Sequence, residues 1–282
     1  MTEAGARLER EGLADVVTVE DPAGDDRAEA VTEHILQMRE AKGLTAAEAA
    51  RDARDPHYFA AALVALGHAD ACVSGATAAT SHVIRAGLHC VGLAPTVSKV
   101  CSMFLMVRGD EVLSYADCGV LPEPDDHDLV DIATITSSHH RLFTGEEPRV
   151  AFLSFSTKGS AVHPRARRMQ AACERFREQH PTIVADGELQ FDAAREPAVA
   201  TRKEPDSPVA GRANVLVFPD LDAGNIAYKI TERVGGFHAL GPLLLGLGKP
   251  CLDLSRGCSA DDIVNVAVIA AVMSQAEQQT SP

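Results

Sequence analysis

The sequence predicts an α/β protein in which mostly parallel β-sheets are covered by helices. Short runs of β-branched residues alternate along the chain with alanine-rich stretches of helical pattern, an order typical of parallel strands joined by helices. The strand runs are mostly apolar, as expected for strands buried on both faces. With 282 residues, 46% of them hydrophobic, the chain can bury the core of one large α/β unit or of two modest domains.

The expected elements follow one another in this alternating order. The predicted strands are residues 16–19, 71–73, 103–107, 112–115, 150–154 and 215–218. The predicted helices are residues 27–42, 45–53, 58–66, 129–143, 165–180 and 225–234, the first and third of which stop at Gly43 and Gly67. The segment 195–212 holds three prolines and many charges, so we expect it to be a surface excursion before a strand that starts at Asn214.

The last helix is apolar on nearly all sides. Ser259 and Asp262, three residues apart, resemble a capping box ahead of the run 263–273. A helix of this kind must be buried, either against a sheet or against another subunit. We therefore expect the end of the chain to return and pack on the N-terminal domain.

Composition and charge exclude several classes of function. The chain carries 26 basic and 40 acidic residues, a net charge of −14, which disfavours nucleic acid and anionic membrane as partners. No apolar run approaches the roughly 18 residues of a spanning helix, and the first thirty residues show no secretory signal. The seven cysteines are scattered without a C-x-x-C pair, which is typical of reduced thiols in a cytoplasmic protein rather than of disulfides or a zinc site.

The standard catalytic motifs are absent from the sequence. It contains no G-x-x-x-x-G-K-[ST] phosphate loop, no G-x-G-x-x-G after a strand, no H-E-x-x-H and no G-x-S-x-G. His139 and His140 are adjacent on a predicted helix, where neighbours point apart, so we interpret them as surface residues and not as a metal pair.

The segment 70–85 has the composition of an anion site. A strand ends at Ser74 and a helix starts within small residues, so free backbone N–H groups would lie beside the hydroxyls of Ser74, Thr77, Thr80 and Ser81. Arg85 lies four residues after Ser81 and therefore on the same helical face. From this segment alone, an ordinary capped helix with a surface arginine is the favoured interpretation.

A second segment of this type is 253–262, where Ser255, Arg256 and Gly257 lead into the capped last helix. An arginine can hold a phosphate through two parallel N–H bonds, and a carboxylate beside it can accept a proton. The helix dipole and Arg256 keep Asp262 ionised and therefore make it a weak base unless it is partly buried. From spacing alone, the interpretation of Asp262 as a helix cap and nothing more is favoured.

Beyond these segments, the chain resembles the phosphate acetyltransferase (phosphotransacetylase) family from Val19 onward. The motifs appear in family order, and the resemblance extends over more than 250 residues, which makes it specific. They are MREAKGL (38–44), VSGA (73–76) with IR (84–85), ADC (116–118), LSFSTKGS (153–160), DGELQ (186–190), DSPVAG (206–211), FPDL (218–221), GNIAYK (224–229) and DLSRGCS (253–259).

The resemblance implies a fold and an assembly. It implies two α/β domains, residues 1–97 with 246–282 and residues 98–245, with the active site in the cleft between them and a homodimer as the assembly. The chain begins after the strand–helix–strand unit with which the family usually opens, so the first domain is expected to be N-terminally shortened.

The resemblance also implies a reaction, the reversible conversion of acetyl-CoA and phosphate into acetyl phosphate and CoA, with no metal and no bound cofactor. Coenzyme A is a substrate, and no covalent enzyme intermediate forms. By motif position Asp262 takes the thiol proton, Ser255 and Arg256 hold the substrate and stabilise developing charge, and Arg39 and Arg85 bind the acetyl phosphate and CoA groups. The remaining substrate-binding candidates are Ser74, Thr77, Thr80, Asn225, Tyr228 and Lys229.

The first anion segment departs from the family pattern. Ala78 stands where the family commonly has His, Ala79 replaces a hydroxyl residue and Ala86 replaces Pro. We expect Thr77, Thr80 and Ser81 to supply the missing hydrogen bonds.

Three alternative functions stay open at this stage. The acyl group can be propionyl or butyryl, because one methylene in an apolar pocket is worth only about 1–3 kcal/mol. The chain can be a non-catalytic acetyl-CoA-sensing module, like the phosphotransacetylase-like domain at the end of some malic enzymes. A dehydrogenase of the isocitrate type is disfavoured, because the carboxylate cluster for its metal is missing from the sequence.

Overall fold

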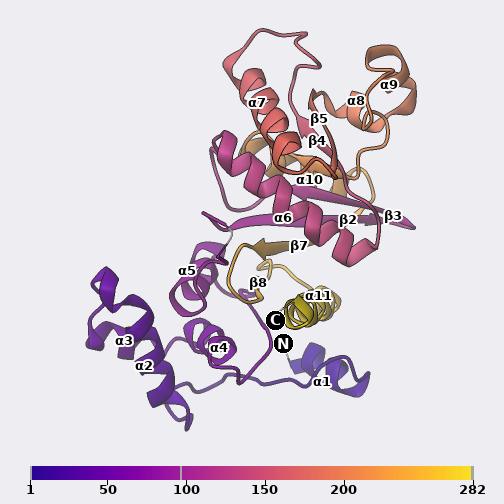
Figure 1. Ribbon diagram of the computed structural model, residues 1–282. Helices are drawn as coiled ribbons and strands as arrows, with labels where there is room; N and C mark the ends of the chain where they lie inside the picture. Colours follow the sequence, from indigo (N-terminus) through magenta and orange to yellow (C-terminus); the bar gives the residue numbers. More distant parts are fainter. Residues whose placement is uncertain (1, 96, 281–282) are drawn as a thin grey trace. The chain divides into compact units, whose positions relative to one another are not determined.

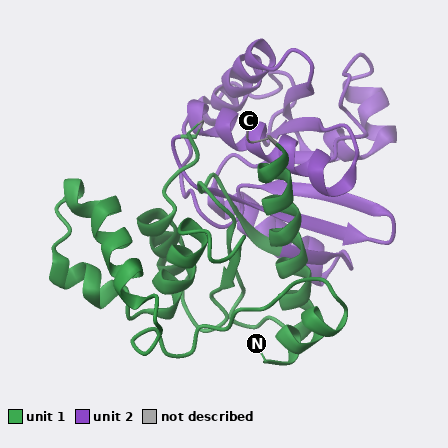
Figure 2. Cartoon of the chain, turned by 60° about the horizontal axis from the view of Figure 1, so that its bottom comes forward, with its two compact units in different colours: residues 1–97, 241–282 green, residues 98–240 purple. Residues whose placement is uncertain are grey.

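The computed structural model describes residues 2–95 and 97–280, and it confirms a mixed α/β architecture with mostly parallel strands flanked by helices (Figure 1). The chain divides into two units (Figure 2). Unit 1 comprises residues 1–97 and 241–282, and unit 2 comprises residues 98–240.

Unit 1 is mainly helical around one pair of parallel strands. Its strands β1 and β8 pair in register, with Cys72 opposite Cys251 and Ser74 opposite Asp253. The elements are α1 (Thr2–Arg10), α2 (Ala28–Arg39), the 3-10 turn η1 (Glu40–Lys42), α3 (Ala46–Asp52), α4 (Pro56–Ala65), β1 (Cys72–Ser74), α5 (Thr80–Cys90), β8 (Cys251–Asp253) and α11 (Ala260–Thr280).

The last helix, α11, returns to unit 1, as the sequence predicts. It packs against α1, β1 and β8, and the apolar side chains of Ile263, Val264 and Val266 are buried there. The capping box is also confirmed, because Ser259 Oγ accepts from the backbone N–H of Asp262 at 3.1 Å and Asp262 Oδ2 accepts from the backbone N–H of Ser259 at 2.8 Å. The alternative of burial against another subunit is therefore not needed to explain this helix.

Unit 2 is built on a sheet of strand order β5-β4-β6-β3-β2-β7. Strands β5, β4, β6 and β3 run parallel, whereas β2 and β3 form an antiparallel hairpin. Strand β7 carries the chain from unit 2 back into unit 1. The elements are β2 (Cys101–Arg108), β3 (Glu111–Ala116), α6 (Asp126–Thr144), β4 (Arg149–Leu153), α7 (Pro164–Gln179), β5 (Val184–Leu189), α8 (Phe191–Arg195), α9 (Pro197–Lys203), β6 (Val215–Val217), α10 (Leu221–Arg233) and β7 (His238–Leu245).

Helices cover both faces of this sheet. Alternate residues of a strand point to opposite faces, so Phe104 and Ser114, which are on different faces, mark the two sides. Phe104 stacks on Tyr228 of α10 at 4.0 Å between ring centroids, whereas Ser114 contacts α6 and Phe152 packs against Phe176 of α7. Coverage on both sides explains why the strands read as continuous apolar runs.

The interpretation of His139 and His140 as surface residues is wrong for His140. Its side chain is fully buried under α6, where Nδ1 lies 2.9 Å from Ser114 Oγ. Burial lowers the pKa of His140 to about 4, so the ring is neutral at physiological pH. The helix faces the sheet along a stripe of residues 133, 136, 137 and 140, and in that interface the Ser114 hydroxyl meets Nδ1 of His140 while its Nε2 has no hydrogen-bond partner among the residues that the structure describes.

The structure departs from the predicted elements in several places, and helices α1 and α8 were not predicted. Residues 16–19 form no strand and belong to no helix. The segment 195–212 is not wholly irregular, because α9 lies within it. Strands β5, β7 and β8 escaped prediction: β5 contains Asp186, Gly187 and Glu188, β7 contains a Gly-Pro pair, and β8 has only three residues. In β5, the ion pair from Lys158 and the hydroxyl of Ser207 satisfy Asp186 inside the unit.

All seven cysteines are free thiols, in agreement with the sequence analysis. Among the helices of residues 2–95 and 97–280, none combines the length and apolar content that a membrane span requires.

Candidate active site

The ends of β1 and β8 bring the two anion-type segments of the sequence to one place in unit 1. Both strands are parallel and end level with each other, since Ser74 pairs with Asp253. The loop after β1 leads to α5, and the loop after β8 leads to α11. In α/β sheets, ligands bind at the carboxyl ends of the strands, where such loops emerge.

A buried carboxylate, Asp253, links these two segments. Its side chain is 1% exposed, and Thr80 Oγ1, in the first turn of α5, donates a hydrogen bond to Asp253 Oδ2 at 2.5 Å. Burial raises the pKa of Asp253, and the Thr80 hydroxyl opposes that rise. The other oxygen, Oδ1, has no hydrogen-bond partner and lies against Gly75, where a Cβ would overlap it. No local sequence pattern predicts this role for Asp253, because the register of β1 with β8 creates it.

The residues that follow β8 are open to solvent. Ser255 and Arg256 are exposed, and the Ser255 carbonyl accepts from the backbone N–H of Cys258 at 3.0 Å, which closes a tight turn. Asp262 uses Oδ2 for the capping box, where it accepts from both the backbone N–H and the hydroxyl of Ser259. The capping interpretation of Asp262 is thus confirmed, and its Oδ1 is left outside the cap.

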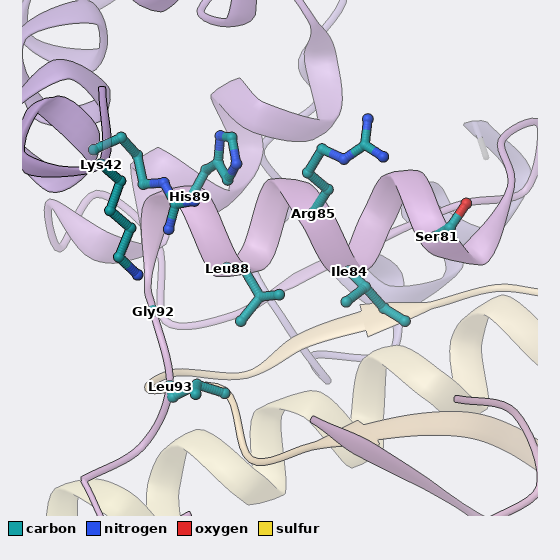
Figure 3. A pocket seen from close by; sticks show the side chains of 9 residues that line it. Lys42, Ser81, Ile84, Arg85, Leu88, His89, Gly92 and Leu93 are labelled. Carbon is teal, nitrogen blue, oxygen red and sulfur yellow. The ribbon is translucent and has the colours of Figure 1, made fainter. Parts of the chain in front are cut away.

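A pocket of about 580 Å³ lies in unit 1 between the end of α2 and one side of α5 (Figure 3). Arg39, Lys42 and Arg85 give it three positive charges, with Ser81 and His89 as further polar groups. Its remaining lining is formed by Ile84, Leu88, Gly92 and Leu93. A concave surface with three cations and an apolar wall is suited to an anion that also carries an apolar part.

The sequence predicted Arg39, Arg85 and Ser81 in this region but missed Lys42 and His89. Helical spacing is the signal that could have found these two residues. Lys42 lies one turn after Arg39, and His89 lies four residues after Arg85. Burial and the charge of Arg39 lower the pKa of His89, so its ring is neutral and able to accept or donate a hydrogen bond.

Three further candidates lie on α10 of unit 2. Asn225 Nδ2 donates to the carbonyl of Cys118 at 3.1 Å, and its Oδ1 accepts from Lys229 Nζ at 2.9 Å. The Lys229 ammonium lies 5.6 Å from the centroid of the Tyr228 ring. Gly224 lets α10 lie close to Asp117, the residue that follows β3, because a Cβ at position 224 would overlap the Asp117 carbonyl oxygen.

All of the site residues described above lie in the part of the chain that matches one family model. Residues 2–271 match the model described as phosphate acetyl/butaryl transferase. The chain belongs to this family.

Relatives and solved structures agree with the assignment to the phosphate acetyl/butaryl transferases. A phosphate acetyltransferase of Paracoccus denitrificans is 45% identical and is matched over 98% of this chain and 92% of its own length. One from Bacillus subtilis (strain 168) is 43% identical over 92% of this chain and 79% of its own length. The crystal structure of a phosphotransacetylase from Streptococcus pyogenes superposes with a TM-score of 0.91 at 39% identity, over 98% of this chain and 90% of that one.

In this transferase, the residues carried over from the family motifs fall into three groups. Arg39 and Arg85 line the same pocket. Ser74 is the last residue of β1, and Thr77 and Thr80 follow it, whereas Ser255, Arg256 and Asp262 follow β8, the strand paired with β1. Asn225, Tyr228 and Lys229 are on α10 of unit 2.

Proposed function

We propose that this chain is a phosphate acetyltransferase that converts acetyl-CoA and phosphate into acetyl phosphate and CoA, and runs the reverse reaction. Phosphate acetyltransferases at 40–45% identity over most of the chain support this activity. The observation that carries the proposal is the pocket in which Arg39, Lys42 and Arg85 converge, because all substrates and products are anions. A protein of net charge −14 needs such a local concentration of cations to attract them.

The proposed chemistry is a direct transfer without an acyl-enzyme. Asp262 accepts the proton of the CoA thiol through Oδ1, the oxygen that the capping box leaves free. The thiolate attacks the carbonyl carbon of acetyl phosphate, the new C–S bond forms, and the C–O bond to phosphate breaks. Ser255 and Arg256 stabilise the negative charge that develops on the carbonyl oxygen and on the departing phosphate.

The other candidates bind rather than react. Arg39 and Arg85 hold acetyl phosphate and CoA groups, and the hydroxyls of Ser74, Thr77 and Thr80 add hydrogen bonds at the end of β1. Thr80 already gives its proton to Asp253, so only its oxygen lone pairs are available to a ligand. Asn225, Tyr228 and Lys229 are proposed to contact substrate from unit 2. That the two units are the two domains, with the active site in a cleft between them, stays a prediction.

We further infer a cytoplasmic homodimer that needs no bound cofactor and acts on small molecules. An exposed apolar stripe on α10 supports self-association, because Ile226, Ile230 and Val234 are 57%, 56% and 82% exposed and are spaced four residues apart. A second copy that covers this stripe would remove it from water.

The family description also covers butyryl transfer, so the longer acyl phosphates are the second candidate substrates. The non-catalytic sensing module predicts CoA binding without turnover. One assay distinguishes acetyl transfer, transfer of a longer acyl group and CoA binding without turnover.

Acetyl-CoA formation from acetyl phosphate and CoA, followed by thioester absorbance, tests the function directly. Purified protein without added metal is expected to turn over acetyl phosphate faster than propionyl or butyryl phosphate at equal concentration. Faster turnover of a longer substrate would reassign the acyl group. Absence of turnover, with CoA binding measured by calorimetry, would support the sensing module and overturn the proposal.

Replacing Arg85 with alanine is expected to raise the KM for acetyl phosphate by about tenfold or more, because one charge-assisted pair to phosphate is worth about 1.5–3 kcal/mol. Steady-state kinetics with varied acetyl phosphate measures this change. Arg202→Ala, at an exposed position on α9, is the control and should leave the KM unchanged. An unaltered KM in Arg85→Ala would remove this arginine from the phosphate site.

Cys258→Ala is expected to keep most of the activity. Burial and the neighbouring Asp262 raise the pKa of the Cys258 thiol, so little thiolate is present at neutral pH. Direct transfer also requires no enzyme nucleophile. The kcat of the folded variant tests whether Cys258 is a nucleophile, because complete loss of turnover would indicate an acyl-enzyme route.

A further inference from the structure

Two histidines of unit 1 face the same carboxylate. Asp55 is the N-cap residue of α4, and its Oδ1 accepts from the backbone N–H of His57 at 2.8 Å. His57 Nδ1 lies 3.0 Å from Asp55 Oδ1, and His82 Nε2, in the first turn of α5, lies 2.9 Å from Asp55 Oδ2. The two imidazole rings meet edge to face with centroids 5.0 Å apart. Side chains from two helices therefore converge on one point.

The geometry is close to that of a metal coordination shell. One ligand atom from each of the three residues can be chosen so that all lie within 4.8 Å of one another. In tetrahedral zinc sites the metal–ligand bonds are about 2.0–2.2 Å, which separates neighbouring ligand atoms by roughly 3.3 Å. His57 Nδ1 lies 3.0 Å from Asp55 Oδ1 and His82 Nε2 lies 2.9 Å from Asp55 Oδ2, so each nitrogen is within a few tenths of an ångström of that spacing from one oxygen of the same carboxylate.

Access and charge also suit a cation. The side chains of His57, Asp55 and His82 are 18%, 32% and 34% exposed, so an ion can enter from solvent and keep water as a remaining ligand. The backbone N–H of His57 donates to Asp55 Oδ1 at 2.8 Å, a contact that favours the charged carboxylate. The carboxylate is therefore ionised at neutral pH and supplies the negative charge that a divalent ion requires.

We propose that Asp55, His57 and His82 form a binding site for a divalent transition-metal ion of the zinc class. Two imidazoles and one carboxylate are ligands that Zn²⁺, Co²⁺ and Ni²⁺ share, whereas Mg²⁺ and Ca²⁺ prefer oxygen donors. Binding requires both rings to turn a nitrogen lone pair, in place of an N–H, toward the ion. The ion ties the start of α4 to the first turn of α5, the helix that carries Ser81 and Arg85 into the anion pocket. The acetyl transfer itself does not use this ion, so the proposal is independent of the proposed function.

Calorimetric titration of chelator-treated protein with ZnCl₂ tests the site. We expect one equivalent to bind to the full chain, with affinity at least about tenfold weaker in His57→Gln and in His82→Gln, since even outer-shell changes at zinc sites cost 10–100-fold. His68→Gln, at an exposed histidine of the same unit, is the matched control and should bind as the unchanged protein does. Circular dichroism of each variant verifies that the fold is retained, because neither histidine is the capping residue of α4.

Cobalt supplies a second readout that does not depend on activity. Co²⁺ in this site should give the visible absorption of a tetrahedral or five-coordinate ion without a thiolate-to-cobalt charge-transfer band, because the site contains no cysteine. No saturable binding, or binding that survives in the double variant His57→Gln/His82→Gln, would overturn the proposal. A thiolate band would do the same and would direct attention to the half-buried Cys72 and Cys258.

Discussion

Replacing Asp262 with asparagine is expected to lower the kcat of acetyl transfer by about 10²–10⁴-fold, with little change in the KM for CoA. The amide oxygen of asparagine can still accept from the backbone N–H of Ser259, so the helix cap is largely kept. What the variant loses is a group that takes up the thiol proton. Steady-state kinetics with varied CoA separates the two parameters.

Asp261→Asn is the matched control for this experiment. Asp261 is the adjacent carboxylate, its side chain is 77% exposed, and it pairs with Arg7 of α1. Exposed ion pairs contribute little to stability, so this variant should keep its kcat and its fold. An unchanged kcat in Asp262→Asn would assign Asp262 to capping alone and would leave the base of the reaction to be found elsewhere.

Replacing Gly75 with alanine is expected to destabilise unit 1 by about 2–4 kcal/mol and to remove most of the activity. Gly75 has a φ of +101°, and an added Cβ would overlap Asp253 Oδ1. Asp253 must then move, which breaks its hydrogen bond with Thr80 and disturbs the end of β8 from which Ser255 and Arg256 emerge. Urea unfolding and the acetyl-CoA assay measure the two effects.

Gly67→Ala separates backbone strain from this overlap. Gly67 also has a positive φ, +78°, but no atom lies within 4 Å of a Cβ at that position. The control should therefore lose only about 1 kcal/mol of stability and keep its activity. Equal losses in the two variants would show that Asp253 is not held in place by Gly75.

Much of the fold was predictable because local sequence signals and tertiary structure agree. Strands β1, β2, β3, β4 and β6 appear within a few residues of the apolar runs that predicted them, and Gly43, Gly67 and Ser259 mark helix ends as expected. The strand β5 was not predictable, because Asp186 and Glu188 make it look like a loop. Their partners, Lys158 and Ser156, come from another segment of the chain, so only the folded unit supplies the compensation.

The candidate site likewise has one part that the sequence predicts and another part that only the folded structure provides. Motif resemblance alone assigned the family and proposed Arg39, Arg85, Ser255, Arg256 and Asp262 as site residues, because each lies in or next to a short contiguous pattern. The pairing of β1 with β8, which joins Thr80 to Asp253, and the meeting of His57 with His82 on Asp55 were decided by tertiary structure. The partners in these contacts are separated by 173 and 27 residues along the chain, and no local pattern specifies which distant side chain will bond to a given carboxylate. The sequence determined which chemistry the chain carries, and packing determined which groups act together, because hydrogen-bond partners are chosen by proximity in the folded core.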